Sequence, residues 1–505
     1  MNKRLLALGV SAALALTACA GDDDDTAGTA APATEAAAPD TAAPDTPAPS
    51  STTGSATTPA SEPDETAPET SAAAATTVAE AGDDDGIRNV PDEYATIQEA
   101  VDAAVPGDLV LIAPGTYHEA VDVGTDEIVI RGLDRDTVVL DGEFELDNAI
   151  RVLGAQDVAV ENLTTINYTN NGLYWVGSTG YRASYITTYR TGDYGIYAFD
   201  SVDGLIEHSH TVGSRDAGVY IGQCYPCNAV IRNVVSSNNG LGYSGTNSGG
   251  NLLIVESVFH NNRAGIVPNS GSYELCYPER DTTIVGNLVY DNNQPDTPAI
   301  DVALLAQGNG ILVAGGVRNV IERNRVDEHN RTGIGMVPFL EEFPNDVVPP
   351  QDQWDMPCSE QKDLPVEVPE GAILWDSLDN RVVGNVVTGS GEADIALASA
   401  DPLTSAFGNC VAANEAASYA PAALAELAPC DGEPTSTDFA TGDLGVVRWL
   451  GEQASLPPEV DWREAPLPEL GEHENMPDAA TAPAAPAVDM PPAIDLDAIA
   501  VPDRP

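Results

Sequence analysis

Lysine is nearly absent from this chain. Only Lys3 and Lys362 occur in 505 residues, and the formal net charge at pH 7 is −58. Nucleic acid is excluded as a partner, because its phosphates require a basic surface. Tight binding of other polyanions is disfavoured for the same reason. A salt-rich environment would explain the acidity, because screening relieves the repulsion between carboxylates.

Long apolar runs are also missing. The longest, Leu5–Leu16, follows a basic start and is too short to span a membrane, so residues 1–18 are predicted to be a secretory signal. The sequence Leu16-Thr17-Ala18-Cys19 resembles the lipobox of bacterial lipoproteins. The resemblance implies an exported protein that is held at the cell membrane or cell surface by a lipid on Cys19. The alternative is an ordinary signal peptide with a chance cysteine.

Two segments lack the composition of a folded domain. Residues 20–86 contain no Lys or Arg and are dominated by Ala, Thr, Pro, Ser, Asp and Glu. Together with Cys19 they are predicted to form a disordered tether over residues 19–86. The acidic, Pro/Ala-rich extension 436–505 is predicted to be largely disordered. The folded domain then covers residues 87–435.

Seven cysteines occur, and six remain if Cys19 carries a lipid. An even number in an exported protein predicts disulfides. Cys410 and Cys430 are expected to close the C-terminal segment. The other four are expected at one corner of the fold, with their connectivity open: Cys224, Cys227, Cys276 and Cys358. A metal or redox site at the first two of these is the alternative.

Glycine followed by an aliphatic residue returns at a fixed period. Gly172, Gly195 and Gly218 are 23 residues apart, the step to Gly240 is 22, and Gly310 and Gly333 are again separated by 23. This period is typical of a solenoid, in which each repeat buries its apolar face against its neighbours. Asparagines close a second strand in several repeats and are predicted to form structural ladders: Asn162, Asn233, Asn287, Asn324 and Asn385.

A short amphipathic helix is predicted just before the repeats. Ile97, Ala100, Val101 and Ala104 share one face, with Thr96 as the N-cap, and a strand follows at residues 109–113. The stretch from Thr96 to Tyr117, with the repeats after it, resembles the right-handed parallel β-helix proteins of the pectin lyase-like superfamily over about residues 90–415. We therefore expect an all-β fold, a right-handed parallel β-helix (solenoid) with an N-terminal capping helix.

Alternation along the strands predicts an aromatic surface. One residue after each repeat glycine the side chain is apolar and points inward, so the next residue points outward. That outward position holds Tyr174, Tyr197 and Tyr220. Coils about 4.8 Å apart would stack the three rings into an exposed ladder suited to sugar rings. The alternatives are that the tyrosines only stabilise the sheet or lie under a loop. Gln223 is a further candidate for substrate binding.

Two carboxylates occupy equivalent positions in adjacent repeats. Asp193 and Asp216 each precede a repeat glycine by two residues. Like charges one strand spacing apart repel, so a cation such as Ca²⁺ bridges them, Arg215 neutralises them, or one carboxyl keeps its proton. A protonated and an ionised carboxyl together can cleave a glycosidic bond. The alternative is a solvated corner with the side chains splayed apart.

His208 and His210 are candidates for proton transfer, and their spacing of two predicts side chains on the same face of one strand.

Longer excursions at 269–282, 294–307 and 338–370 interrupt the repeats, and such loops are where a solenoid usually builds its site.

These patterns support three hypotheses about function. The first is a surface-anchored lipoprotein that binds or processes carbohydrate, of the polysaccharide lyase, glycosidase or epimerase type. The second is a non-catalytic adhesin, scaffold or glycan-binding protein. The third is an accessory protein for metal or cofactor maturation, with His208 and His210 as ligands. The sequence contains no catalytic residue set of a pectin methylesterase, polygalacturonase or epimerase, so no catalytic residue is assigned from these families.

Overall fold

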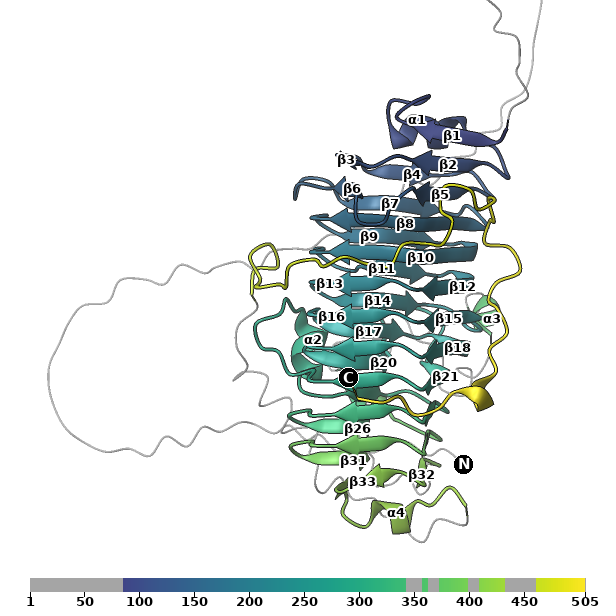
Figure 1. Ribbon diagram of the computed structural model, residues 1–505. Coiled ribbons are helices and arrows are strands. Elements are labelled where there is room, and N and C mark those ends of the chain that lie inside the picture. Colours follow the sequence, from purple (N-terminus) through teal and green to yellow (C-terminus); the bar gives the residue numbers. More distant parts are fainter. Residues whose placement is uncertain (1–84, 342–356, 362–371, 398–407, 432–459, 505) are drawn as a thin grey trace, which may run out of the picture. The chain divides into compact units, whose positions relative to one another are not determined.

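The computed structural model describes residues 85–341, 357–361, 372–397, 408–431 and 460–504, all within one compact unit (Figure 1). The N-terminal cap forms as predicted. Helix α1 (Ile97–Ala103) begins at Thr96, whose hydroxyl accepts a hydrogen bond of 3.1 Å from the Glu99 amide. Ile97, Ala100 and Val101 are buried. A strand follows at Leu109–Ile112.

Parallel strands stack coil upon coil and form three walls, as the right-handed β-helix predicts. Wall B is a sheet of eleven strands. Its strands are β4 (Val121–Val123), β7 (Asn148–Leu153), β9 (Asn171–Val176), β11 (Ile196–Phe199), β14 (Ala217–Gly222), β17 (Leu241–Thr246), β20 (Ala264–Asn269), β23 (Ile311–Ala314), β26 (Thr332–Val337), β31 (Ala393–Leu397) and β34 (Tyr419–Ala420).

The other two walls share one larger sheet, because β8 (Val158–Ile166) and β10 (Thr179–Tyr189) run through both. Besides these, wall A1 contains β1 (Ile87–Val90), β2 (Leu109–Ile112), β5 (Val129–Gly132), β12 (Val202–Glu207), β15 (Ala229–Arg232), β18 (Gly249–Val255), β21 (Arg280–Val285), β24 (Val320–Glu322), β29 (Arg381–Val383) and β32 (Cys410–Ala412). Wall A2 contains β3 (Gly115–Tyr117), β6 (Val138–Asp141), β13 (His210–Val212), β16 (Val235–Ser237), β19 (Val258–His260), β22 (Leu288–Tyr290), β25 (Arg325–Asp327), β30 (Val386–Thr388) and β33 (Glu415–Ala416).

The predicted inward positions form the core. In wall B the registers Leu173–Ile196–Val219 and Trp175–Ala198–Ile221 are continuous from coil to coil, and all six side chains are fully buried. Stacking of like positions is what makes a repeat of fixed length stable.

The predicted asparagine ladders divide into two kinds. Asn287, Asn324 and Asn385 form a true ladder, in which each side-chain amide donates to the next carbonyl oxygen at 3.0 Å. Asn162 and Asn233 instead adopt the left-handed backbone at the corner, with φ of 56° and 51°. Asparagine suits both places, because it tolerates positive φ and can also bond along a stack.

Insertions leave the coils at the predicted places. Residues 270–279 separate β20 from β21, and helix α2 (Asp301–Ala306) lies between β22 and β23. Within the excursion 338–370 the structure describes residues 338–341 and 357–361. The described elements of this excursion are β27 (Phe339–Glu341) and α3 (Cys358–Gln361). Strand β28 (Ile373–Trp375) follows the excursion and pairs antiparallel to β27. Helix α4 (Leu424–Leu427) follows the last coil.

The C-terminal segment 460–504, here called the strap, packs against the coils, although its composition predicts little order (Figure 1, yellow). It includes one 3-10 turn, η2 (Leu496–Ala498). Arginines of the coils donate to its backbone carbonyls: Arg131 to Ala482 and Pro483, Arg182 to Ala485, Arg190 to Trp462, Arg463 and Ala465, Arg323 to Leu496 and Ile499, and Arg325 to Pro502. The rest of the extension, 436–459, lies outside the described residues.

Apolar anchors complete the strap. Trp462 packs edge-to-face on Phe144 at 5.5 Å, and Ile499 is buried against Val255 and Val285. Composition shows that the strap has no core of its own, but it cannot show that arginines elsewhere in the chain will satisfy its carbonyls.

Candidate functional site

Three tyrosines stack on the outer face of wall B, as the alternation predicts. Tyr174, Tyr197 and Tyr220 are in register on β9, β11 and β14. The rings of Tyr174 and Tyr197 are 5.1 Å apart and inclined by 7°, and those of Tyr197 and Tyr220 are 4.9 Å apart and inclined by 13°. Arg151 precedes them in the same row and pairs with Asp122.

The exposed ladder is shorter than predicted. Tyr174 and Tyr197 are half-buried, but Tyr220 is only 2% exposed. The reason is the 270–279 insertion, whose Glu274 accepts a hydrogen bond from the Tyr220 hydroxyl. The prediction of three exposed rings is therefore wrong for Tyr220.

Asp193 and Asp216 occupy one corner of two adjacent coils, as their spacing predicts. The Asp216 amide donates to the Asp193 carbonyl at 3.0 Å, and the Asp193 amide donates to Asn170 at 2.8 Å. The Asp216 carboxylate accepts a hydrogen bond from the Tyr194 hydroxyl. The Tyr194 ring lies 4.8 Å from that of Tyr197 and 4.7 Å from that of Tyr220, so the carboxylates adjoin the tyrosines.

Burial keeps protons on this cluster. The pKa of Asp216 is raised to about 7, first by burial and then by the charge of Asp193, against the lowering effects of Tyr194 and Arg215. Burial also raises the pKa of Asp193, while Arg215 lowers it. The pKa of Glu274 is raised to about 8, again mainly by burial. Near neutral pH the site thus combines carboxyl groups in both protonation states.

Insertions close one side of this surface. A side chain at Gly240, the coil after Asp216, would meet the Ala303 methyl of α2 at 3.3 Å. Glu274, from the 270–279 insertion, covers Tyr220 from the same, C-terminal side of the stack. Tyr174, Tyr197 and Asp193 therefore keep partial exposure, whereas Tyr220 and Asp216 are buried.

The histidines do not join the carboxylates. His208 follows β12 with a φ of 49°, and its ring stacks on Tyr185 at 4.7 Å. His210 begins β13, and its Nδ1 lies 2.9 Å from Nε2 of His473 in the strap. The prediction that both lie on one face of one strand is wrong, because the chain turns a corner between them.

Gln223 follows β14 at the end opposite to Asp216, and the Sγ atoms of Cys276 and Cys358 lie against its carbonyl oxygen. The Gln223 side-chain oxygen accepts a hydrogen bond of 2.8 Å from the Leu275 amide. The disulfides are Cys224–Cys227, Cys276–Cys358 and Cys410–Cys430. The last confirms the predicted closure of the C-terminal segment, and the first removes the free thiols that a metal site would need.

Among the described residues, no group of three or more His, Cys, Asp or Glu side chains is placed to hold a metal ion. Asp193 and Asp216 would need further oxygen ligands to bind Ca²⁺. Cys19 and Lys362 lie outside the described residues.

Tyr194 and Glu274 are the members of the site that the sequence did not indicate. Tyr194 directly follows Asp193, but tyrosine does not recur there in the neighbouring repeats. Glu274 comes from an insertion, which the repeat period cannot place.

Removing the Asp216 carboxyl should change how stability depends on pH. The unfolded chain loses this proton near pH 3.8 and the folded chain near pH 7, so the group destabilises the fold progressively as pH rises across that window. We expect Asp216→Asn to gain stability relative to the wild type between about pH 4 and about pH 7. Urea denaturation at several pH values measures this, and a difference that does not vary with pH would contradict it.

Comparison with known proteins supports the fold. Residues 171–337 match the family described as right handed beta helix region. This match confirms the resemblance of the coils to the right-handed parallel β-helix superfamily. No curated protein matches the chain.

Several solved structures are similar at low identity. The A-module of the Azotobacter vinelandii mannuronan C-5 epimerase AlgE4 is 14% identical, with 63% of this chain and 90% of that chain covered and a TM-score of 0.40. An alginate lyase from Paenibacillus sp. strain FPU-7 is 15% identical, with 49% and 90% covered and a TM-score of 0.34. The catalytic domain of a GH87 α-1,3-glucanase is 14% identical, with 65% and 68% covered and a TM-score of 0.35. Similarity this low does not indicate an activity.

Proposed function

We propose that the outer face of wall B binds a carbohydrate chain and that Asp193 and Asp216 act on it as an acid–base pair. The observation that carries the proposal is the half-buried stack of Tyr174 and Tyr197 beside two carboxyls in adjacent coils. Aromatic faces offer a large contact area to the apolar faces of sugar rings, and carboxyl oxygens accept hydrogen bonds from hydroxyl groups.

The chemistry follows from the protonation states. Asp216 holds a proton close to neutral pH and can give it to a leaving oxygen, while Asp193, when ionised, can act as base or nucleophile. Coils are about 4.8 Å apart, close to the spacing of roughly 5 Å between the carboxyls of retaining glycosidases. The hydroxyl of Tyr194, bonded to Asp216, offers a path for the proton toward the tyrosine face.

A glycan-binding protein without catalysis is the second candidate. The observation that favours it is the burial of Asp216, which is 8% exposed. The third hypothesis, metal or cofactor maturation, loses its ligand pair, because His208 and His210 lie on either side of a corner and each contacts another ring.

Tyr197→Ala tests the binding surface. It removes the central ring of the stack, and we expect at least a tenfold loss of affinity for the glycan identified on a polysaccharide panel. Isothermal titration calorimetry measures the loss. Tyr290→Ala is the matched control, because Tyr290 is also half-buried and stacked, on His260 in wall A2. Equal losses in both variants would contradict the proposal.

We further propose that the protein is exported and anchored through a lipid on Cys19. No described helix is long and apolar enough to cross a membrane. Cys19→Ser should move the protein from the membrane fraction to the soluble fraction of the producing cells. Unchanged fractionation would contradict the anchor.

A further inference from the structure

The outer face of wall B carries two rows of partly exposed side chains that run along the stack. The first row is Arg151, Tyr174 and Tyr197, and the second is Leu153, Val176 and Phe199, each in register on β7, β9 and β11. The first row continues to Asp122 of β4, whose side chain is 63% exposed. Three coil spacings of about 4.8 Å make this strip roughly 14 Å long, whereas its two rows are only about 7 Å apart. A bound chain therefore finds its longest contact along the stack.

The strip ends at β14. Tyr220, Ser244 and Val267 continue the first row in register, but they are only 2%, 4% and 1% exposed. Gly222, which continues the second row, is also buried. The outer face thus passes from partly exposed to buried within one coil, between Tyr197 and Tyr220.

Helix α2 covers the row beyond this point. Its Ala303 belongs to one apolar cluster with Leu241 of β17 and Val267 of β20. The fully buried Arg263 donates to the Thr297 carbonyl at 2.8 Å, which ties the segment before α2 to the coils. The cover is therefore held by both apolar packing and hydrogen bonds.

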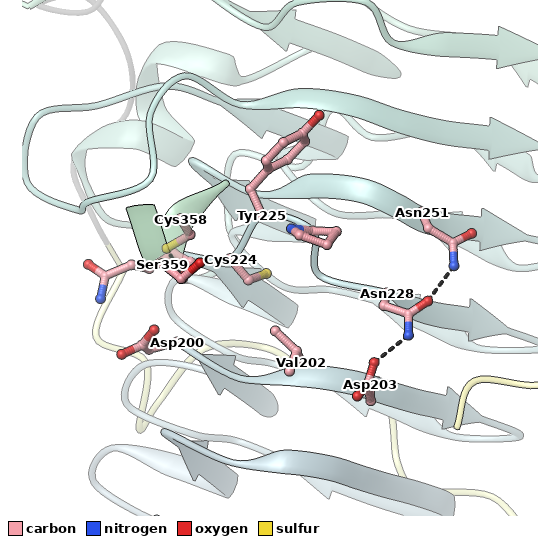
Figure 2. Close-up of a pocket in the computed structure, with 11 residues that line it drawn as sticks. Asp200, Val202, Asp203, Cys224, Tyr225, Asn228, Asn251, Cys358 and Ser359 are labelled. Atoms are coloured by element: carbon pink, nitrogen blue, oxygen red, sulfur yellow. Dashed lines mark hydrogen bonds between the residues drawn. The ribbon is translucent and has the colours of Figure 1, made fainter. Parts of the chain in front are cut away.

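The insertion that carries Glu274 covers Tyr220 directly, and its position is fixed. The disulfide Cys276–Cys358 links this insertion to α3. Figure 2 shows Cys358 beside the loop that carries Tyr225, whose carbonyl accepts a hydrogen bond of 2.8 Å from the Cys358 amide. The strip is therefore closed at this end before any ligand arrives.

The two carboxyls lie at the closed end. Asp193 precedes β11, the last strand with partly exposed outward residues, and Asp216 precedes β14, the first strand that is buried throughout. A sugar unit on Tyr197 is the last that the strip can hold, because the next unit would have to displace Glu274 from Tyr220. The interior of a chain needs room on both sides of each unit, whereas a chain end needs room on one side only.

We propose that wall B binds the ends of carbohydrate chains rather than their interiors, with the terminal unit on Tyr197. The inference rests on the proposed carbohydrate binding by wall B and specifies its substrate class, a chain terminus. The units that follow lie over Tyr174 and Arg151, toward the N-terminal cap.

The number of protein molecules bound per chain tests the proposal. The probes are short and long size fractions of the linear polysaccharides pullulan, β-1,3-glucan, polygalacturonate and alginate. Each is titrated calorimetrically with the Asp216→Asn variant, so that turnover does not shorten the chains. End binding predicts one protein molecule per chain in both fractions of a polysaccharide that binds. Interior binding predicts a number that rises with chain length.

Two variants test where the terminal unit lies. Leu153→Ala changes an outward side chain two coils before Tyr197, and Leu153 is 54% exposed. We expect a several-fold loss of affinity for a hexasaccharide and no loss for the shortest oligosaccharide that binds. Tyr197→Ala should weaken the binding of both at least tenfold. Val105→Ala is the matched control for Leu153→Ala, because Val105 is 52% exposed and lies in the N-terminal cap.

The outcomes separate this inference from the proposed function. A number of bound molecules that rises with chain length, with Tyr197→Ala still defective, would overturn end recognition and leave the proposed function standing. Loss of the shortest oligosaccharide in Leu153→Ala, equal to that in Tyr197→Ala, would overturn the placement of the terminal unit. If none of the polysaccharides binds, the proposed function fails and this inference fails with it.

Discussion

Replacing Asp216 by Asn should lower turnover about 10²–10⁴-fold, the usual contribution of a positioned acid. The carboxyl holds its proton to about pH 7, so its loss removes the donor that is available near neutrality. Affinity should change little, because an amide oxygen can still accept the hydrogen bond from Tyr194. Product release from the polysaccharide identified by the binding panel measures the effect.

Asp92→Asn is the control for this experiment, because Asp92 is an exposed aspartate in the N-terminal cap. Turnover of Asp216→Asn at the wild-type rate would remove the carboxyl from the mechanism. Saturable binding by the wild type without product on long incubation would favour the non-catalytic candidate.

Replacing Glu161 by Gln should destabilise the fold by about 3–5 kcal/mol, as is typical when one partner of a buried ion pair is removed. Glu161 is 2% exposed and bonds both Arg131, at 2.6 Å, and Arg182. Without its charge, two buried guanidinium groups would lose their shared counterion. Urea denaturation monitored by tryptophan fluorescence measures the change.

Asp122→Asn is the matched control, because Asp122 also pairs with an arginine, Arg151, but at an exposed site. Its expected cost is below about 1 kcal/mol. Equal costs for the two variants would show that burial does not determine the contribution of Glu161. Faster proteolysis of the strap in Glu161→Gln is also expected, since Arg131 and Arg182 donate to strap carbonyls.

The coils could be predicted because the residue pattern that defines them is short and recurs in each repeat. One period and one alternation place Leu173 inside, Tyr174 outside and Asp216 next to Asp193 in the adjacent coil, and the structure agrees in each case. The same logic predicts the stacking of Tyr197 on Tyr174. A helix cap such as Thr96 is equally local.

What could not be predicted depends on contacts between distant segments. Glu274 reaches Tyr220 across 54 residues, and no period links them. His208 and His210 appear equivalent in the sequence, but His208 is itself the left-handed corner residue after β12, whereas His210 is the first residue of β13. His473 meets His210 only because the strap returns along the coils.

The strap has a consequence for how the molecule comes apart. In a plain stack each coil is stabilised by its two neighbours alone, so the ends can fray while the middle persists. Here one continuous segment is bonded to coils as far apart as those of Arg131 and Arg325. Unfolding of one coil then weakens the contacts between the strap and many other coils. Thermal unfolding should therefore approach a single cooperative transition rather than proceed stepwise from the termini.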